Sequence, residues 1–199
     1  MKKLAVALIA VTFVLVGCAK PPQAAIDTAH SALEKAEGAQ ASKYAADALK
    51  TAEEALKAAD QELQAQKQKF ALLRSYKKSE ELLATALEQA QSAEAAAIQG
   101  KKQATDEANA ALTAARNAVT QAQDQLAALG ECPKHPKGFA ADLEVLQGSI
   151  SGLAAQIPAI EQAIAGEDFF GARTQAESLE QQTAPVLSDL VAAREKLGC

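Results

Sequence analysis

Few side chains in this sequence could bind a metal ion or a haem group. The chain has three Cys and two His, and one of each lies in the segment Cys132-Pro133-Lys134-His135. A structural zinc site usually needs four such ligands, and the second histidine, His30, is distant in the sequence. Covalent haem attachment needs a Cys-x-x-Cys-His motif, which does not occur. The segment is therefore predicted to be a surface loop, with no metal and no other cofactor.

Acidic residues occur in adjacent pairs, as in Glu53-Glu54 and Glu80-Glu81. Adjacent residues on a helix do not face one another, so these pairs are typical of a solvated helix face and not of an acid–base site. The sequence has no Gly-rich phosphate-binding loop, and its two His leave no Ser-His-Asp set to assemble. We expect a protein that is not an enzyme.

The first of the three cysteines, Cys18, follows a segment with the properties of a secretory signal. Lys2 and Lys3 supply a positive start, residues 4–16 form an apolar run, and the small residue Gly17 follows it. A membrane-spanning helix needs about 20 apolar residues, so this run is too short for one. Residues 1–17 are predicted to be a signal peptide that is removed.

The four residues Leu15-Val16-Gly17-Cys18 resemble the lipobox of bacterial lipoproteins. The resemblance implies that Cys18 is diacylated on its sulfur, because only a thiol forms the required thioether, and acylated on its amine after cleavage. Two or three acyl chains such as palmitate hold a protein durably on a bilayer. In Gram-negative lipoproteins an Asp after the cysteine often causes inner-membrane retention. Here Ala19 follows, which implies a lipid anchor in the outer membrane, facing the periplasm; surface exposure remains the alternative.

Charge excludes some partners. The chain has 20 Lys and Arg against 25 Asp and Glu, a net charge of −5, and removal of residues 1–17 takes away two lysines and no acid, which gives −7. Nucleic-acid binding favours basic patches, so no nucleic-acid partner is expected. The overall balance also offers no polybasic second membrane anchor. Abundant Ala, Glu, Gln, Lys and Leu with few aromatic residues are typical of long helices or coiled coils.

Cys132 and Cys199 remain after lipidation of Cys18. Outside the inner membrane the environment is oxidising, which favours a disulfide. The expected helix order brings both cysteines to one end of the C-terminal bundle, and neighbouring Gly and Pro let the backbone adjust to the Cα separation of about 5.5–6 Å that a disulfide prefers. We predict this bridge, with intermolecular pairing or free thiols as the alternatives.

Apolar residues recur at steps of three and four through most of the chain, which predicts helices. Gly38 is expected to end the first helix in a left-handed cap. Phe70 and Leu73 are expected to open the apolar stripe of a third helix, which has about 60 residues and a possible bend at Gly100. The helices predicted up to this point are residues 22–37, 42–66 and 70–129.

Residues 130–138, with two Pro and two Gly, predict a loop. The helix after it is expected to kink at Pro158, because proline removes a backbone hydrogen bond and clashes with the preceding turn, and to end at Gly166. Asp168 is a favourable N-cap for the last helix. In that helix Pro185 implies a kink or a break.

These helices predict an all-α fold of elongated, Ala-rich, coiled-coil-like antiparallel bundles that share one long central helix. Residues 18–23 are predicted to form a linker that is lipidated at Cys18, as the lipobox resemblance implies, and stiffened by two prolines. Residues 24–100 are predicted to form a three-helix bundle. Residues 101–199 are predicted to form a second helical bundle.

Residues 21–100 contain small and apolar residues at helical spacing: Pro22, Ala25, Ala29, Leu33, Ala36, Gly38-Ala39, Tyr44-Ala45, Leu49, Ala52, Leu56, Tyr76, Leu83, Ala86 and Ala90. With these residues the segment resembles a family of helical domains that follow lipoprotein signals in Gram-negative bacteria and whose function is not established. The resemblance implies a location and an architecture but no reaction. Residues 131–199 do not resemble the peptidoglycan-binding domain found in some members.

Two functional hypotheses follow. In the first, the protein is a non-enzymatic, lipid-anchored spacer, scaffold or interaction module whose Ala and Leu stripes contact a partner protein or a second copy. In the second, it binds an apolar ligand between kinked C-terminal helices, with Phe139, Phe169 and Phe170 lining the gap. The alternative for these three side chains is that they fill the core.

Overall fold

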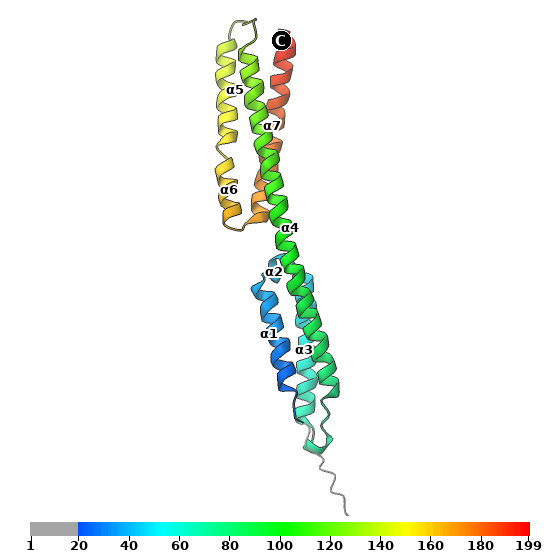
Figure 1. Ribbon diagram of the computed structural model, residues 1–199. Coiled ribbons are helices and arrows are strands. Elements are labelled where there is room, and N and C mark those ends of the chain that lie inside the picture. Colours follow the sequence, from blue (N-terminus) through cyan, green and yellow to red (C-terminus); the bar gives the residue numbers. More distant parts are fainter. Residues whose placement is uncertain (1–19) are drawn as a thin grey trace, which may run out of the picture. The chain divides into compact units, whose positions relative to one another are not determined.

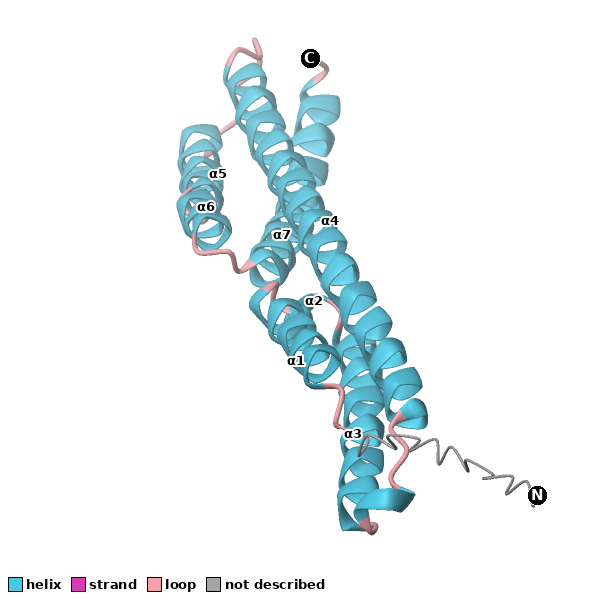
Figure 2. Ribbon diagram, turned by 60° about the horizontal axis from the view of Figure 1, so that its bottom comes forward, coloured by secondary structure: helices cyan, strands magenta, loops and turns pink. Residues whose placement is uncertain are grey.

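The computed structural model describes residues 20–199, and over this range the protein is all-α, as predicted (Figure 1, Figure 2). Residues 1–17, which were predicted to be a signal peptide, and Cys18 lie outside the described residues. No described helix is both long and apolar enough to cross a membrane. The elements are α1 (Gln23–Gly38), α2 (Ala41–Tyr44), α3 (Ala46–Gln68), the 3-10 turn η1 (Ala71–Leu73), α4 (Lys77–Gly130), α5 (Phe139–Ala154), α6 (Ile157–Ala165) and α7 (Phe169–Leu197).

The chain divides into two compact units, one ending at Ile98 and the other beginning at Gln99. Helix α4, of 54 residues, belongs to both and is the long central helix that the apolar pattern predicts. Its first part packs with α1, α2 and α3, and its last part packs with α5 and α7. The sequence predicted the boundary between the two bundles at residue 100, close to the one observed.

The core of the first unit changes character along its length. Around α2 the buried residues are nearly all alanine, including Ala36, Ala41 and Ala93. Closer to the start of α4 they include larger side chains such as Leu63 and Leu83. Alanine lets helix axes approach closely but removes little area from water, so the larger side chains supply most of the hydrophobic stabilisation.

The predicted helix over 42–66 is wrong at its N-terminal end. The backbone leaves the helical conformation at Ala45 (φ −150°, ψ 45°), which separates the single turn α2 from α3. The left-handed residue that ends α1 is Gln40 (φ 63°), not Gly38. This path buries Ala41 completely in the same cluster as Ala36. A periodic apolar pattern does not reveal such a break, because Ala41, Ala45 and Ala48 keep the helical spacing of four and three residues across it.

The predicted start of the long helix at residue 70 is also wrong. Helix α3 continues to Gln68, and the chain then forms an irregular loop with η1 before α4 begins at Lys77. Phe70 and Leu73 are 71% and 72% exposed and take no part in the core. The buried stripe begins instead at Tyr76, which is 4% exposed.

Four helices form the second unit. The ends of α4 and α7 pack with α5 around Leu129, Ile150 and Leu190, and α6 buries Ile160. Exposed ion pairs join α4 to its neighbours: Arg173 lies 2.7 Å from Glu107, and Arg116 pairs with Glu161. Solvent screening makes such pairs weak, so the buried apolar residues hold this unit together.

Pro158 and Pro185 have different effects on their helices. Pro158 does not kink a continuous helix, because α5 ends at Ala154 and Pro158 lies in the first turn of α6, where its missing N–H costs nothing. Pro185 lies inside α7, which continues through it, so the predicted alternative of a break does not occur. The predicted N-cap is confirmed: the Asp168 carboxylate accepts a hydrogen bond from the Gly171 N–H at 3.2 Å.

Replacement of Leu179 tests the core of the second unit. Leu179 is fully buried, so Leu179→Ala should lower the free energy of unfolding by about 2–5 kcal/mol through lost burial and a new cavity. Val191, on the same helix, is 45% exposed, and Val191→Ala should cost under about 0.5 kcal/mol. Urea denaturation followed by circular dichroism measures both; equal effects would contradict the packing.

Glu62 makes the first unit sensitive to acid. Its pKa is lowered by the hydrogen bond from Gln66 and by Lys78, whose Nζ lies 2.9 Å away. A carboxylate with a lowered folded-state pKa stabilises the protein above its unfolded pKa, and this contribution disappears as the pH falls through the folded value. Glu62→Gln should therefore flatten the acid limb of a stability–pH curve measured by thermal denaturation; an unchanged limb would contradict this assignment.

Candidate functional site: the disulfide-closed end of the second unit

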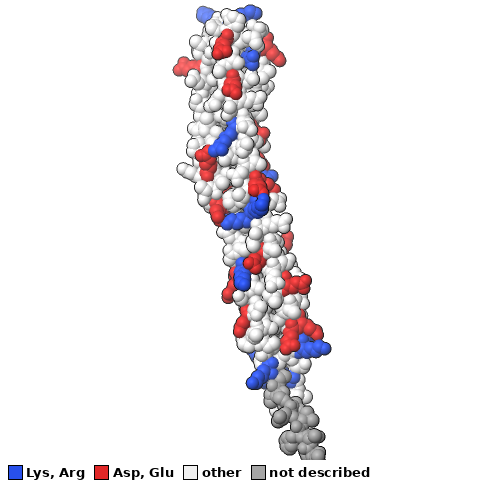
Figure 3. Space-filling view, viewed as in Figure 1, with Lys and Arg blue, Asp and Glu red and all other residues white. Residues whose placement is uncertain are grey.

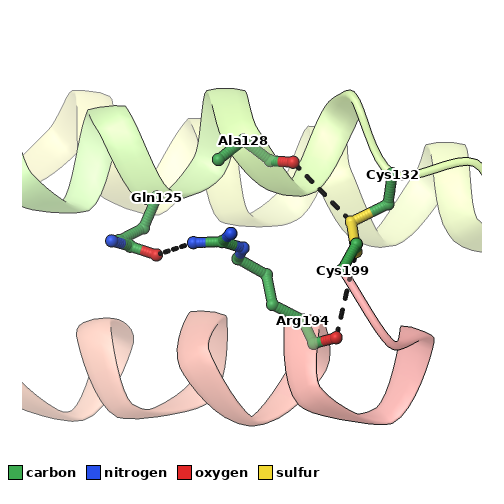
Figure 4. Close-up of a disulfide and its surroundings, with 5 residues drawn as sticks. All are labelled: Gln125, Ala128, Cys132, Arg194 and Cys199. Atoms are coloured by element: carbon green, nitrogen blue, oxygen red, sulfur yellow. Dashed lines mark hydrogen bonds between the residues drawn. A yellow bond between two sulfur atoms is a disulfide. The ribbon is translucent and has the colours of Figure 1, made fainter.

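The structure brings the two predicted cysteines together where α4 and α7 end (Figure 4). Cys132 and Cys199 form a disulfide with their Cα atoms 5.7 Å apart, across a separation of 67 residues. That spacing is the one a disulfide prefers. Cys132 is buried at 2% exposure, whereas Cys199 at the chain end is exposed.

The local sequence explains how Cys199 reaches Cys132. Gly198 adopts a left-handed conformation (φ 74°) after the last turn of α7, and its N–H donates to the Arg194 carbonyl at 2.9 Å. The Cys199 N–H donates to the same carbonyl at 3.2 Å. Glycine permits this reversal without strain. The chain thus turns back at the end of α7, toward Cys132.

A polar contact supports the disulfide. The Arg194 guanidinium Nη1 donates to Gln125 Oε1 at 2.7 Å and joins α7 to α4 (Figure 4). The sulfur of Cys132 lies 3.6 Å from the Ala128 carbonyl oxygen, and that of Cys199 lies 3.8 Å from the Arg194 carbonyl oxygen. In the reduced protein each thiol would therefore have an acceptor beside it.

Two cavities flank α5. One, of about 290 Å³, lies among α4, α5 and α7 next to the disulfide end. The other, of about 410 Å³, lies between α4 and α5. Leu143 lines both and is only half-buried. The first cavity is lined by Leu129, Pro136, Phe139, Asp142, Leu143, Leu146, Ala193, Lys196 and Leu197.

The smaller cavity has the chemistry of an apolar binding site. Its lining is mainly aliphatic, and the only charged lining residues are Asp142 and Lys196, which carry opposite charges. Phe139 is held by stacking on His135, with ring centroids 4.7 Å apart and planes 11° apart. A groove of about 560 Å³ in the first unit is larger, but it is lined mostly by polar and charged residues of α3. Apolar pockets with a few polar groups are the usual form of ligand sites.

The three phenylalanines proposed to line one gap do not lie together. Phe139 packs near Leu197 at the disulfide end. Phe169 and Phe170 begin α7, whose 29 residues rise by about 1.5 Å each, so they lie about 40 Å away along the helix. Phe169 is buried, and Phe170 is 47% exposed. The cavity is lined instead by leucines that the sequence pattern does not distinguish from ordinary core residues.

The two His and the paired acidic residues lie apart from one another. His135 lies in the exposed loop after α4, and His30 lies in the first unit, 3.6 Å from Asp60. Over residues 20–199, no group of three or more acidic, His or Cys side chains could hold a metal ion. The pairs Glu53-Glu54 and Glu80-Glu81 are exposed on helix surfaces.

The disulfide should stabilise the second unit. The chain-entropy model gives about 4 kcal/mol for a loop of this length, so Cys132→Ser with Cys199→Ser should lower the free energy of unfolding by about that amount in urea denaturation. Dithiothreitol should destabilise the wild-type protein. The double variant serves as the control and should be unaffected. Two free thiols in freshly purified protein would contradict the bridge.

Comparisons with known proteins add no assignment. No known family matches the chain, and neither do any of the curated proteins or solved structures. The resemblance to domains that follow lipoprotein signals therefore stays a prediction from the sequence. The geometry of the described residues is the remaining guide to function.

Proposed function

We propose that this protein is a lipid-anchored envelope protein that works without catalysis, as a helical scaffold or interaction module at the periplasmic face of the outer membrane. Support for the anchor comes from the resemblance of Leu15-Val16-Gly17-Cys18 to a lipobox. Support for interaction comes from the second helical unit, and one observation carries it: the weakly charged exposed face of α5 and α6.

This face carries fewer charged residues than α3 does. Residues 139–165 contain only three charged residues, Asp142, Glu144 and Glu161. Its other exposed residues are Ala, Gly, Ser, Gln, Pro and Val, with Val145 68% exposed. Helix α3, by contrast, exposes several Lys, Glu and Asp side chains. The centres of protein interfaces are depleted in charged residues, so this face is suited to contact.

The two cavities beside α5 also favour contact with a partner helix. They leave Leu143 and its neighbours incompletely covered on both flanks of the helix. An apolar helix laid along one flank of α5 would place side chains at helical spacing into the cavity on that flank, a common mode of helix recognition. The partner is therefore a helix of another envelope protein or of a second copy of this chain.

A second candidate function is supported by the smaller cavity. Its apolar lining would suit a small apolar ligand held beside Phe139 and Leu146. Native mass spectrometry of protein purified from its own membrane separates the two functions. A bound apolar molecule that is lost in Leu146→Asp would favour ligand binding over partner binding.

Cross-linking in intact cells tests the interaction. A photo-reactive residue at Val145 or Ser149, both exposed on α5, should give a defined cross-linked product with an envelope protein or with a second copy. The same residue at Lys50, exposed on α3, is the matched control and should give none. No product at any position, together with a monomer in sedimentation, would contradict an interaction module.

Palmitate labelling tests the anchor. The wild-type protein should incorporate labelled palmitate and begin at Cys18, because lipidation of the thiol precedes cleavage. Cys18→Ser should remain unlabelled and keep residues 1–17. An unmodified N-terminus on a freely soluble wild-type protein would contradict the lipid anchor.

A further inference from the structure

The loop between α3 and α4 exposes an unusual set of side chains. Phe70, Leu72 and Leu73 are 71%, 62% and 72% exposed. Residues 67–78 include five basic residues and no acidic one, in a chain whose net charge is −5. Whole-chain composition hides this local basic segment. The basic residues are Lys67, Lys69, Arg74, Lys77 and Lys78.

Hydrogen bonds give this loop a defined shape. The Arg74 guanidinium donates to the carbonyl oxygens of Lys69 and Lys67, at 3.0 Å each. The Ser75 N–H donates to the Gln66 side chain at 3.1 Å. Tyr76 is buried in the core beneath. The apolar side chains are therefore held outward on an ordered backbone and are not simply unpacked.

The loop lies at the end of the first unit where the chain enters it. Helices α1 and α3 are antiparallel, and His30 lies 3.6 Å from Asp60 across them. Ile26, in the first turn of α1, packs on the same cluster as Leu63 and Tyr76. Both ribbon views place the start of α1 beside the end of α3 and the following loop (Figure 1, Figure 2). Figure 3 shows Lys and Arg side chains at this end of the unit.

A lipid anchor at Cys18 would hold this end close to the bilayer. Cys18 precedes the start of α1 at Gln23 by only five residues, which span at most about 17 Å when fully extended. Exposed Lys20, within this linker, adds another positive charge. Any bilayer that contains the acyl chains therefore lies within reach of the loop.

We propose that residues 67–78 form a membrane-contacting tip, in which Phe70, Leu72 and Leu73 enter the interfacial region of the bilayer. Lys67, Lys69 and Lys77 lie against anionic phospholipid head groups. This inference rests on the proposed lipid anchor at Cys18, which supplies the proximity. Apolar side chains with flanking lysines are the usual composition of surfaces that lie on membranes.

The local charges favour a lipid surface over a neutral protein partner. Lys78 is paired with Glu62, and Arg74 caps the end of α3, so these two basic groups are engaged within the unit. The three remaining lysines of the tip are exposed. The nearest acidic residues after the tip, Glu80 and Glu81, lie on the first turns of α4. The tip itself thus presents positive charge around an apolar centre, complementary to an anionic bilayer.

Tryptophan fluorescence tests the contact in the lipidated protein. The chain has no Trp, so Phe70→Trp introduces a single probe, and Val191→Trp on α7 of the second unit is the matched control. In vesicles with brominated lipids, the fluorescence emission of the probe at residue 70 should shift to the blue and be quenched. The emission of the control probe at residue 191 should neither shift nor be quenched. An unquenched probe at residue 70 in a protein that carries palmitate would overturn the tip and leave the anchor standing.

Vesicle binding tests the tip without the anchor. The mature chain from residue 18 with Cys18→Ser should bind phosphatidylcholine vesicles containing phosphatidylglycerol, and bind less at high salt. Replacing Phe70, Leu72 and Leu73 by Ser, or Lys67, Lys69 and Lys77 by Gln, should weaken binding by roughly tenfold or more. These side chains are exposed, so unchanged helicity by circular dichroism confirms folding. Binding by this chain when the wild-type protein lacks palmitate would support the tip and reject the anchor.

Two further outcomes would contradict the proposal in whole or in part. If the serine variant converts a wild-type dimer to a monomer and leaves vesicle binding unchanged, the loop is a self-association surface and the proposal fails. If binding is equal for neutral and anionic vesicles and insensitive to the lysine changes, the electrostatic part of the proposal is wrong.

Discussion

Close packing of alanine along α4 is the constraint on which the rest of the structure depends. In the first unit Ala90, Ala93 and Ala97 are at most 1% exposed, and in the second Ala108 and Ala115 are completely buried. Such small side chains let neighbouring helices approach closely, but each contributes little hydrophobic free energy. Cohesion is therefore spread over the length of the helix, and a few large residues such as Leu83 and Leu179 contribute most of the burial energy.

Each unit has one end at which larger apolar residues gather, and the two ends are built differently. The second unit turns its leucines inward, around Leu129, and closes the end with a disulfide between Cys132 and Cys199. The first unit turns Phe70 and Leu73 outward on a loop shaped by Arg74. An apolar side chain exposed on an ordered backbone is costly in water, which suggests a surface for it to meet.

The proposals share one physical basis, because each depends on contact between surfaces. Alanine-lined helices bring few large side chains together, but they present faces along which a partner can lie. The face of α5 and α6 is poor in charge and flanked by two cavities, which suits another helix. The tip at residues 67–78 is rich in positive charge, which suits lipid. With the proposed acyl chains at Cys18, these two proposed surfaces would let one protein contact a membrane and a partner at once.

The sequence by itself determined the all-α class, the central helix, the Asp168 cap and the pairing of Cys132 with Cys199. These follow from helical spacing, local capping chemistry and the alternating direction of successive helices. Only the tertiary structure decided that α4 begins after Phe70, that Ala45 interrupts a helix, and that a cavity forms at Phe139 away from Phe169. It also decided that α7 continues through Pro185. An apolar pattern has the same period whether a side chain is buried or exposed, and only the neighbours supplied by distant segments select between the two.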